Sequence, residues 1–421
     1  MHARTHRYTL VQSNAPITLV KEITASGEGA IWETDRPGIY AKIYHPSKRT
    51  PERQAKLAAM IEDPPRDPTA PMQHVSLAWP QELVADARQK PLGFIMPSIP
   101  QSRGLITFSN PLLRKRHHRV SWYFLHHLAR NICAVIRSVH RRGYVIGDLK
   151  DENILVNERA LPAIVDCDSF QVRHKGTLHL SPVGTAGFTA PETIGIDFAG
   201  QARTVYSDRF ALAVIIHQLL LSDHPFSGQW SGPGGADEEP PDINVLIRDG
   251  HCRYNPSGRI TAPAHSPRLR FLHPKLRKLM YRAFVQGHKH PKRRPSARSW
   301  EKALTQAARR LRTCREHPSH VYDPYCGPCP WCQLKEQHGI EFFPPAAHLQ
   351  RNSAGGVSAL DVFAPALAPT RFGFWCKRMS RWAVNLILLA ALVAGIWFFQ
   401  QELWAAWQWL EARLTEALAP L

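Results

Sequence analysis

Residues 144–170 read YVIGDLKDENILVNERALPAIVDCDSF, and they carry the strongest fold signal in the chain. The stretch places five polar side chains at fixed steps around a short apolar strand: Asp148, Lys150, Asn153, Asp166 and Asp168. Transfer of a phosphate group to a hydroxyl needs a carboxylate to orient the hydroxyl, a lysine for phosphate charge, and an amide with a second carboxylate for Mg²⁺. The stretch therefore predicts a phosphoryl-transfer site, with a solvated polar turn between a helix and a strand as the alternative.

Two glycines and a lysine upstream fit the same chemistry. Gly27 and Gly29 lie between two short extended runs, and Lys42 follows on the next alternating strand. Glycine has no Cβ, so the backbone can approach phosphate oxygens there, and a lysine one strand away can reach the same oxygens. An ordinary β-hairpin with a lysine downstream is the alternative explanation of this pattern.

Further motifs follow in a fixed order after residue 170. They are GTAGFTAPE at 184–192, SDRFAL at 207–212, HPF at 224–226 and RPS at 294–296. With these motifs at these separations, the chain resembles the protein kinase family over residues 8–310. The resemblance implies an α+β fold with a bilobal protein kinase-like domain that uses ATP and Mg²⁺ or Mn²⁺.

The resemblance also implies roles for the residues of the first motif. Asp148 would accept the hydrogen bond of the substrate hydroxyl, and Lys150 would stabilise the transferring phosphoryl group. Asn153 and Asp166 would hold the metal. Asp168 competes with Asp166 for that role, because the two residues that follow it can mimic the Phe-Gly pair of the family.

The nucleotide is expected to contact three further segments. GFIMPSI at 93–99 resembles the strand and hinge that hold adenine, with Met96 as gatekeeper and Ile99 as backbone donor. Lys42 is expected to pair with an acid on the helix predicted after residue 50. Glu52 either points at Lys42 or is a solvated charge at the helix N-terminus.

Three residues outside the site are expected to act through geometry. In the family, the aspartate at the position of Asp208 caps the backbone of the catalytic loop. Glu192 and Arg294 match a pair that ties the activation segment to the lower lobe. Mutating any of the three is therefore expected to reduce activity indirectly.

Two departures from the family pattern concern regulation and nucleotide binding. The usual His-Arg pair before the catalytic aspartate is Ile146-Gly147 here, which argues against control by phosphorylation of the activation segment. Trp32 replaces the third glycine of the phosphate loop. Neither change removes a charged catalytic group, so an active enzyme is preferred. The alternative is a pseudokinase scaffold that binds nucleotide and recruits a phosphatase or von Willebrand A partner.

Cysteine and histidine residues predict a zinc-binding appendage at 311–335. The four candidate ligands form two knuckles eight residues apart: Cys314, His320, Cys329 and Cys332. In a segment without an apolar core, a metal site would supply the folding energy that packing cannot. A redox-active pair or a disulfide is the alternative. The other cysteines are scattered, which fits a reducing compartment.

These features sharpen the resemblance. The missing His-Arg pair, DCDSF at 166–170, RPSARSW at 294–300 and CPWC at 329–332 are similar to those of one group of bacterial kinases. That group is associated with tellurite-resistance-type von Willebrand A proteins and PP2C-type phosphatases. The resemblance implies a Ser/Thr kinase with a protein substrate and with a PP2C phosphatase and a von Willebrand A protein as partners.

The net charge of +19 is unevenly spread. Residues 259–312 hold sixteen lysines and arginines against one acid. The region has few interleaved aromatics, and its helices carry an ordinary apolar face, which argues against nucleic acid as a partner. A basic face attracted to an anionic membrane surface is the preferred interpretation.

The C-terminal part is expected to anchor the chain in a membrane. A flexible tether is predicted at 336–380, a transmembrane helix at 383–399 and a short amphipathic extracytoplasmic tail at 400–421. A basic triplet precedes the apolar run, so the positive-inside rule places the kinase domain in the cytoplasm. The sequence therefore predicts a single-pass serine/threonine kinase at the plasma (inner) membrane.

Overall fold

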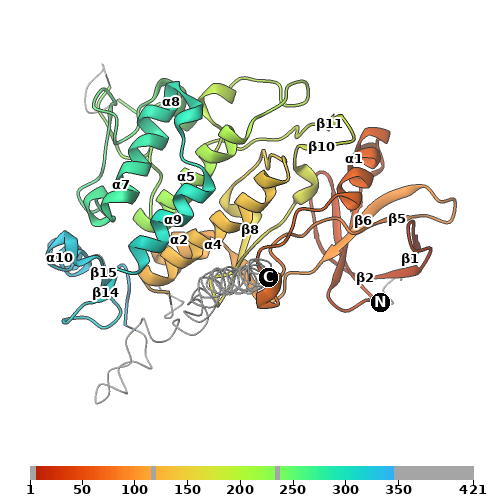
Figure 1. Ribbon diagram of the computed structural model, residues 1–421, viewed down its shortest axis with the longest axis horizontal. Coiled ribbons are helices and arrows are strands. Elements are labelled where there is room, and N and C mark those ends of the chain that lie inside the picture. The colour runs from red at the N-terminus through yellow and green to blue at the C-terminus, as the bar shows by residue number, and fades with distance from the viewer. Residues whose placement is uncertain (1–5, 115–119, 233–237, 346–421) are drawn as a thin grey trace, which may run out of the picture. The chain divides into compact units, whose positions relative to one another are not determined.

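The computed structural model describes residues 6–114, 120–232 and 238–345 of the chain (Figure 1). Its N-terminal part is an antiparallel barrel with one helix. The barrel strands are β1 (His6–Leu10), β2 (Pro16–Ala25), β3 (Gly29–Thr34), β4 (Ile39–Tyr44), β5 (Glu82–Ala85) and β6 (Pro91–Pro97), and helix α1 (Pro51–Glu62) follows β4. The order around the barrel is β1-β2-β3-β4-β6-β5, and pairing of β1 with β5 closes it.

Side-chain alternation along β4 decides where its lysine points. Successive side chains of a strand face opposite sides, so β4 presents one set to the barrel and one to α1. Ala41 belongs to a buried cluster with residues of β1, β2, β5 and β6, whereas Tyr44 belongs to a second cluster with Leu57 of α1 and Phe94 of β6. Lys42 shares the parity of Tyr44, and it therefore lies on the side of the second cluster.

Helix α1 starts at a capped N-terminus beside this second cluster. The Thr50 hydroxyl accepts a hydrogen bond from the backbone N–H of Arg53 (3.3 Å), and Pro51 occupies the first helical position. The buried face of α1 consists of Lys56, Leu57, Ala59 and Met60. The helix thus turns one cation, Lys56, toward the interior.

The C-terminal part is mainly helical. Its elements are β7 (Ser102–Gly104), α2 (Ile106–Ser109), α3 (Pro111–Arg114), α4 (Trp122–Arg141), β8 (Ile154–Asn157), β9 (Pro162–Ile164), β10 (Val172–His174), β11 (Thr177–His179), α5 (Val205–Leu221), β12 (Gln229–Trp230), α6 (Ile243–Asp249), β13 (Ile260–Thr261), α7 (Pro274–Tyr281), α8 (Gly287–Lys289) and α9 (Ala297–Ala308). Amphipathic α4 packs against α9 and α5. Because α5 is apolar on nearly every side, it is buried as the central helix of this part.

The predicted catalytic turn lies between α4 and β8, and the β8–β9 hairpin delivers the chain from it to residue 166. Strands β7, β8 and β9 form one sheet, and the backbone N–H of Val165 donates to the carbonyl of Asn153 (2.9 Å). This bond places the segment after β9 beside the turn that precedes β8. The β8–β9 hairpin thus brings two sequence motifs to one place.

Two long-range contacts expected from the sequence are confirmed. Asp208 of α5 accepts hydrogen bonds from the backbone N–H groups of Ile146 (2.8 Å) and Gly147 (2.9 Å), so it caps the catalytic turn. Arg294, whose side chain is fully buried, donates to both carboxylate oxygens of Glu192 (2.7 and 2.6 Å). This bidentate geometry gives both strength and direction to the pair.

The Cys/His segment forms a small appendage packed on α4. It contains β14 (Arg312–Thr313), β15 (Val321–Tyr322) and α10 (Pro330–His338). The ring of Trp331 contacts Trp122 of α4, with centroids 5.2 Å apart. Phe342 and Phe343 also pack against Trp331, with centroids 5.6 and 4.9 Å away. The first residues of the predicted tether are therefore packed, because Trp331 offers them an apolar surface.

The predicted transmembrane helix requires a correction. Within the three described ranges, no helix has the length and apolar character needed to cross a bilayer. Helix α4 is long enough but has a polar face, and α5 is apolar but has only 17 residues. The predicted span at 383–399 and tail at 400–421 lie outside the described residues. We therefore withdraw the membrane anchor and the single-pass inner-membrane localisation that depended on it.

The Glu192–Arg294 pair yields a stability prediction. Glu192→Ala leaves the Arg294 guanidinium buried without its carboxylate, so we expect the free energy of unfolding to fall by about 2–3 kcal/mol. Chemical denaturation followed by tryptophan fluorescence measures this loss. Glu239→Ala, which removes an exposed acid, is the control and should change stability by less than about 0.5 kcal/mol. Equal behaviour of the two variants would contradict the stabilising role of the pair.

Candidate active site

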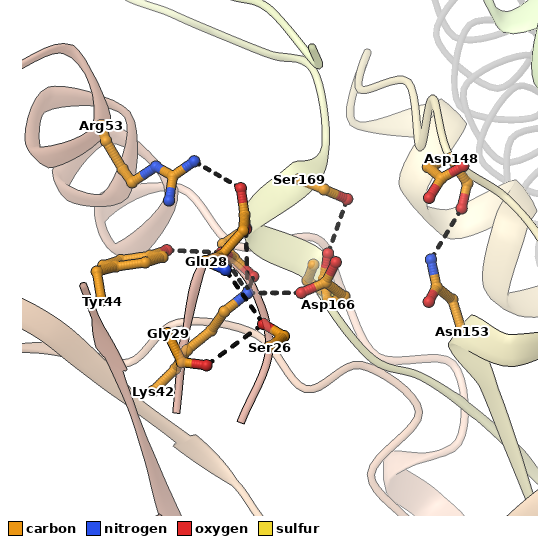
Figure 2. Close-up of polar contacts among 12 residues, drawn as sticks. Ser26, Glu28, Gly29, Lys42, Tyr44, Arg53, Asp148, Asn153, Asp166 and Ser169 are labelled. Atoms are coloured by element: carbon orange, nitrogen blue, oxygen red, sulfur yellow. Dashed lines mark hydrogen bonds and ion pairs between the residues drawn. The ribbon is translucent and has the colours of Figure 1, made fainter. Parts of the chain in front are cut away.

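Three carboxylates surround the ammonium group of Lys42 on β4 (Figure 2). Its Nζ lies 2.6 Å from Asp166 Oδ1 and 2.8 and 2.9 Å from the two oxygens of Asp168. Glu28 Oε2 is 3.7 Å away. The structure thus brings together Lys42, Asp166 and Asp168, which were predicted from separate motifs. Glu28, the residue between the two predicted phosphate-loop glycines, was missed.

The two glycines of this turn differ in what they do. A Cβ on Gly29 would lie 2.2 Å from the carbonyl oxygen of Ile43, so this glycine allows β3 to pair closely with β4. A Cβ on Gly27 would meet no atom within 4 Å. The backbone at Gly27 is therefore open to an approaching group, as phosphate binding requires, whereas Gly29 is needed for strand packing.

Charge and burial oppose one another in this cluster. Burial alone would lower the pKa of Lys42, but attraction to Asp168 and Asp166 outweighs it and raises the pKa above its usual value. Burial would likewise raise the pKa of Asp168, but the Lys42 ammonium and the hydrogen bond from Tyr44 lower it. Burial and the charge of Asp168 raise the pKa of Asp166. Of the two aspartates, Asp168 is therefore the one held more strongly in its ionised form.

Asp166 adopts a backbone conformation that is uncommon for a residue with a side chain. Its φ is +58°, in the left-handed region, and the turn Cys167–Ser169 follows it. The Ser169 hydroxyl and backbone N–H both donate to the carbonyl of Asp166 (2.8 and 3.1 Å), while Cys167 is buried. The turn therefore directs both acids toward Lys42, and such strained conformations are concentrated at functional sites.

The structure does not bring Glu52 to Lys42. Glu52 is exposed in the first turn of α1, where hydrogen bonds with its own backbone N–H and with Thr50 lower the pKa of its carboxylate. The helical register turns Lys56 inward instead, and Arg53 of α1 donates to Glu28 (2.8 Å). The helix thus contributes cations to the site, and Glu52 has the helix N-terminal role considered as its alternative.

The catalytic turn holds Asp148 by several contacts. Asp148 is buried, and its Oδ1 accepts a hydrogen bond from the Thr185 hydroxyl (2.7 Å). Lys150 Nζ lies 3.5 Å from Asp148 Oδ2 and 3.1 Å from Glu152. The Asn153 amide donates to the carbonyl of Asp148 (3.0 Å). These contacts fix one carboxylate oxygen and leave the other facing the lysine.

An arginine from a distant segment supports the same turn. Gly147 has a φ of +80°, and a Cβ there would lie 2.5 Å from the Arg203 guanidinium. Arg203 donates to the carbonyl of Gly147 (2.9 Å) and to the hydroxyl and carbonyl of Ser181 (2.6 and 2.8 Å). Glycine at 147, where the family has arginine, thus makes room for the Arg203 guanidinium. The sequence spacing did not predict this contact of Arg203.

The predicted adenine segment borders the second apolar cluster. Met96, the next-to-last residue of β6, is a buried member of that cluster. Ile99 is a half-buried side chain packed against the cluster, together with Ile31 and Val165. The backbone N–H of Ser98 donates to Gly38 (2.8 Å), so it is engaged within the chain. The partly exposed Ile31, Ile99 and Val165 side chains form an apolar surface suited to a base.

The donor set fits a hard divalent cation. The Asn153 amide nitrogen is engaged with the Asp148 carbonyl, so its oxygen remains available as a ligand. The Asp166 side chain is 40 % exposed, and Lys42 occupies only its Oδ1. In the view of Figure 2, Asp166 lies between Lys42 and Asn153. An amide and a carboxylate oxygen are ligands of the kind Mg²⁺ takes.

The four predicted zinc ligands converge in the appendage. Cys314 and Cys332 have their sulfurs 3.7 Å apart, and His320 Nδ1 lies 3.3 Å from Cys332 and 3.8 Å from Cys329. Zinc bonds of about 2.3 Å to sulfur and about 2.0 Å to nitrogen, at tetrahedral angles, place ligand atoms roughly 3.5–3.8 Å apart. The observed spacings fit that geometry, and all the ligand atoms lie within 4.8 Å of one another.

The second nitrogen of the histidine is also engaged. Glu341 Oε1 lies 2.8 Å from His320 Nε2, which leaves Nδ1 facing the sulfurs. A carboxylate behind a histidine orients the ring of a metal ligand. Cys326 instead donates to the carbonyl of Phe271 (3.1 Å), outside the cluster. Glu341 was not singled out in the sequence, since it lies in the predicted tether.

Comparison with known proteins agrees with this geometry. Residues 105–302 match the family model described as protein kinase domain. The chain is 32% identical to protein kinase YegI of Escherichia coli K12 over 362 residues, which are 83% of this chain and 54% of that protein. It is 34% identical over 134 residues to mouse ribosomal protein S6 kinase alpha-6, covering 31% of this chain and 16% of that kinase.

A solved structure, the ROP18 kinase domain in complex with AMP-PNP and sucrose, aligns with a TM-score of 0.47 at 13% identity, covering 72% of this chain and 84% of that one. The chain spans about half the length of the YegI proteins it matches. Neither a PP2C phosphatase nor a von Willebrand A protein is among these relatives, so those partners stay predictions. The matched region includes the capped turn with Asp148 and the Glu192–Arg294 pair, and the chain therefore contains a protein kinase domain.

Proposed function

We propose that the chain transfers phosphate from ATP, with Mg²⁺ or Mn²⁺, to serine or threonine hydroxyls of a protein substrate. The observation that supports this most is the meeting of Lys42 and Asp166 beside the catalytic turn with Asp148 and Asn153. A positive group for phosphate, two oxygen ligands for metal and a carboxylate for the hydroxyl are the parts that phosphoryl transfer needs.

Each residue has a separate role in this proposal. Asp148 orients the incoming hydroxyl through the oxygen that Thr185 does not hold, and Lys150 lies beside that oxygen to meet phosphate charge. Asn153 and Asp166 would hold the divalent ion, which neutralises charge on the phosphates when bound. Gly27 and Lys42 bind the phosphate end of the nucleotide.

The base of the nucleotide has its own surface in the proposal. Met96, buried in the second apolar cluster, would be the gatekeeper behind the adenine, and the backbone N–H of Ile99 would donate to the base. Gly29 contributes indirectly because it permits the close pairing of β3 and β4, which positions Lys42. Glu52 has no role in this proposal, since it lies exposed on α1.

The rival function is a pseudokinase scaffold that binds nucleotide and recruits a phosphatase or von Willebrand A partner. The scaffold and the enzyme differ in one measurable property, which is the transfer of phosphate from ATP. The contacts of Asp148 favour the enzyme, because a scaffold has no need of a buried carboxylate with one oxygen held by Thr185 and the other near a lysine.

The appendage is proposed to hold one structural zinc through Cys314, His320, Cys329 and Cys332. Burial raises the pKa values of the Cys329 and Cys332 thiols, so both thiols keep their protons without a metal. A bound zinc ion would displace these protons, because metal ligands must be deprotonated. The metal would tie the β14–β15 hairpin to the start of α10, since two ligands come from each side.

The first prediction concerns transfer. Full-length protein with radiolabelled ATP and Mg²⁺ should label itself or a generic protein substrate, and Asp148→Asn should reduce the rate by about 10²- to 10⁴-fold while nucleotide binding persists. Asp151→Asn is the matched control in the same turn, because its carboxylate accepts hydrogen bonds from its own backbone N–H and from that of the adjacent Glu152. Nucleotide binding by wild type without any transfer would favour the scaffold.

The second prediction concerns the metal. Asp166→Asn removes a proposed Mg²⁺ ligand, so transfer should be lost and raising the Mg²⁺ or Mn²⁺ concentration should recover part of it. Asp168→Asn should leave a measurable fraction with the wild-type metal dependence, because Asp168 is buried against Lys42. Initial rates against metal concentration give both results. The opposite ranking would assign the metal to Asp168.

The third prediction concerns zinc. Full-length protein purified without chelator should contain one zinc per chain by elemental analysis, and Cys332→Ser should lose it. Cys326→Ser is the matched control, because that thiol lies outside the cluster. Chelation should loosen the appendage while nucleotide affinity stays within about twofold, since the ligands lie outside the nucleotide site. Metal-free wild-type protein would refute the site.

A further inference from the structure

We propose that Asp168 is the residue that positions Lys42, taking the place of a carboxylate on helix α1. The proposal rests on the proposed function, because Lys42 is the residue that would meet the nucleotide phosphates. Asp168 is a positioning residue here and touches neither nucleotide nor metal. Asp166, two residues earlier, bonds Lys42 through Oδ1 and keeps its second oxygen for the metal.

The geometry separates the two acids clearly. Asp168 offers both carboxylate oxygens to the Lys42 ammonium (2.9 and 2.8 Å), whereas Asp166 offers one (2.6 Å). The Asp168 side chain is 5 % exposed and that of Asp166 is 40 % exposed. The Tyr44 hydroxyl also donates to Asp168 (2.6 Å). The buried acid therefore has its oxygens engaged inside the protein, and the exposed acid has one to offer a ligand.

Helix α1 has no acid in a position to serve Lys42. Glu52 is exposed in its first turn, and Glu62 at its end contacts His174 and Lys175. On the buried face the helix carries Lys56, whose ammonium donates to the carbonyl of Leu180 (3.1 Å). A cation there cannot hold Lys42, so the compensating charge must come from elsewhere.

The source of that charge has a mechanical consequence. A buried ammonium requires a nearby anion, since an unpaired charge in the interior is costly. When Asp166 turns toward a metal, Asp168 remains beside Lys42, so the ammonium keeps its place. Asp166 and Asp168 lie on the same short turn, and the anchor of Lys42 is therefore attached to the metal-binding segment and not to α1.

A double-mutant cycle tests the proposal through binding. Full-length wild type, Lys42→Met, Asp168→Asn and the double variant are titrated with a fluorescent ATP analogue, with and without Mg²⁺. We expect Asp168→Asn to weaken binding about tenfold when Lys42 is present and less than about twofold when it is methionine. Equal losses of affinity with Lys42 and with methionine at this position would mean that Asp168 supports the overall fold and does not act through Lys42. That result would overturn the proposal.

Two further variants separate the ion pair from its surroundings. Tyr44→Phe removes one hydrogen bond to Asp168 but keeps the pair, so binding should change less than about threefold. Glu52→Gln should leave binding unchanged, and a loss equal to that of Asp168→Asn would assign the role to α1 and contradict us. If Asp168→Asn fails to fold, Asp168→Glu replaces it in the cycle, where displacement of the carboxylate should show the same dependence on Lys42.

The outcome is independent of whether the proposed function holds. If Lys42 and Asp168 are coupled in a protein that transfers no phosphate, this inference is supported and the proposed kinase activity is refuted. Transfer by wild type without coupling between the two residues would overturn the inference and leave the activity in place. Both readouts use the same protein preparation.

Discussion

The buried ammonium of Lys42 is the constraint on which the site depends. A charge in the interior has to be compensated by nearby opposite charge and hydrogen bonds. Lys42 meets this requirement with Asp166, which precedes the turn Cys167–Ser169, and with Asp168 inside that turn. Glu28, from the turn between β2 and β3, adds a third carboxylate. One side chain therefore joins the barrel to the segment that follows β9. Arg53 extends the network to α1 through Glu28.

A second set of contacts holds the catalytic turn independently of any phosphate group. Asp208 caps its backbone, and Arg203 links the carbonyl of Gly147 to Ser181 in the segment that follows β11. Lys56 binds the neighbouring carbonyl of Leu180. The segment that follows β11 is thus connected both to α1, through Lys56, and to the catalytic turn, through Arg203. This provides a physical reason why a chain lacking the arginine before Asp148 can keep an ordered site.

The parts predictable from sequence are those in which the chemistry is local. Asp148 and Asn153 share one turn, so their spacing in the sequence predicted that they lie close together. The zinc candidates form two short knuckles, and their spacing likewise predicted a shared site. The position of Asp166 could be predicted because an apolar strand directly precedes it. The contributions of Glu28 and Arg203 depend on contacts between distant segments, which no spacing encodes. Glu52 was the only early acid on its helix, but helical register turned Lys56 inward instead. The membrane helix was inferred from an apolar run that lies outside the described residues.

The central claim is that the Lys42 cluster forms the phosphate and metal end of a nucleotide site. The most direct test is a crystal structure of the full chain with a non-hydrolysable ATP analogue and Mg²⁺. The account predicts that Lys42 faces the phosphates while still paired with Asp168, with the metal held between Asn153 and Asp166. A nucleotide bound elsewhere, or Lys42 paired with an acid of α1, would contradict it.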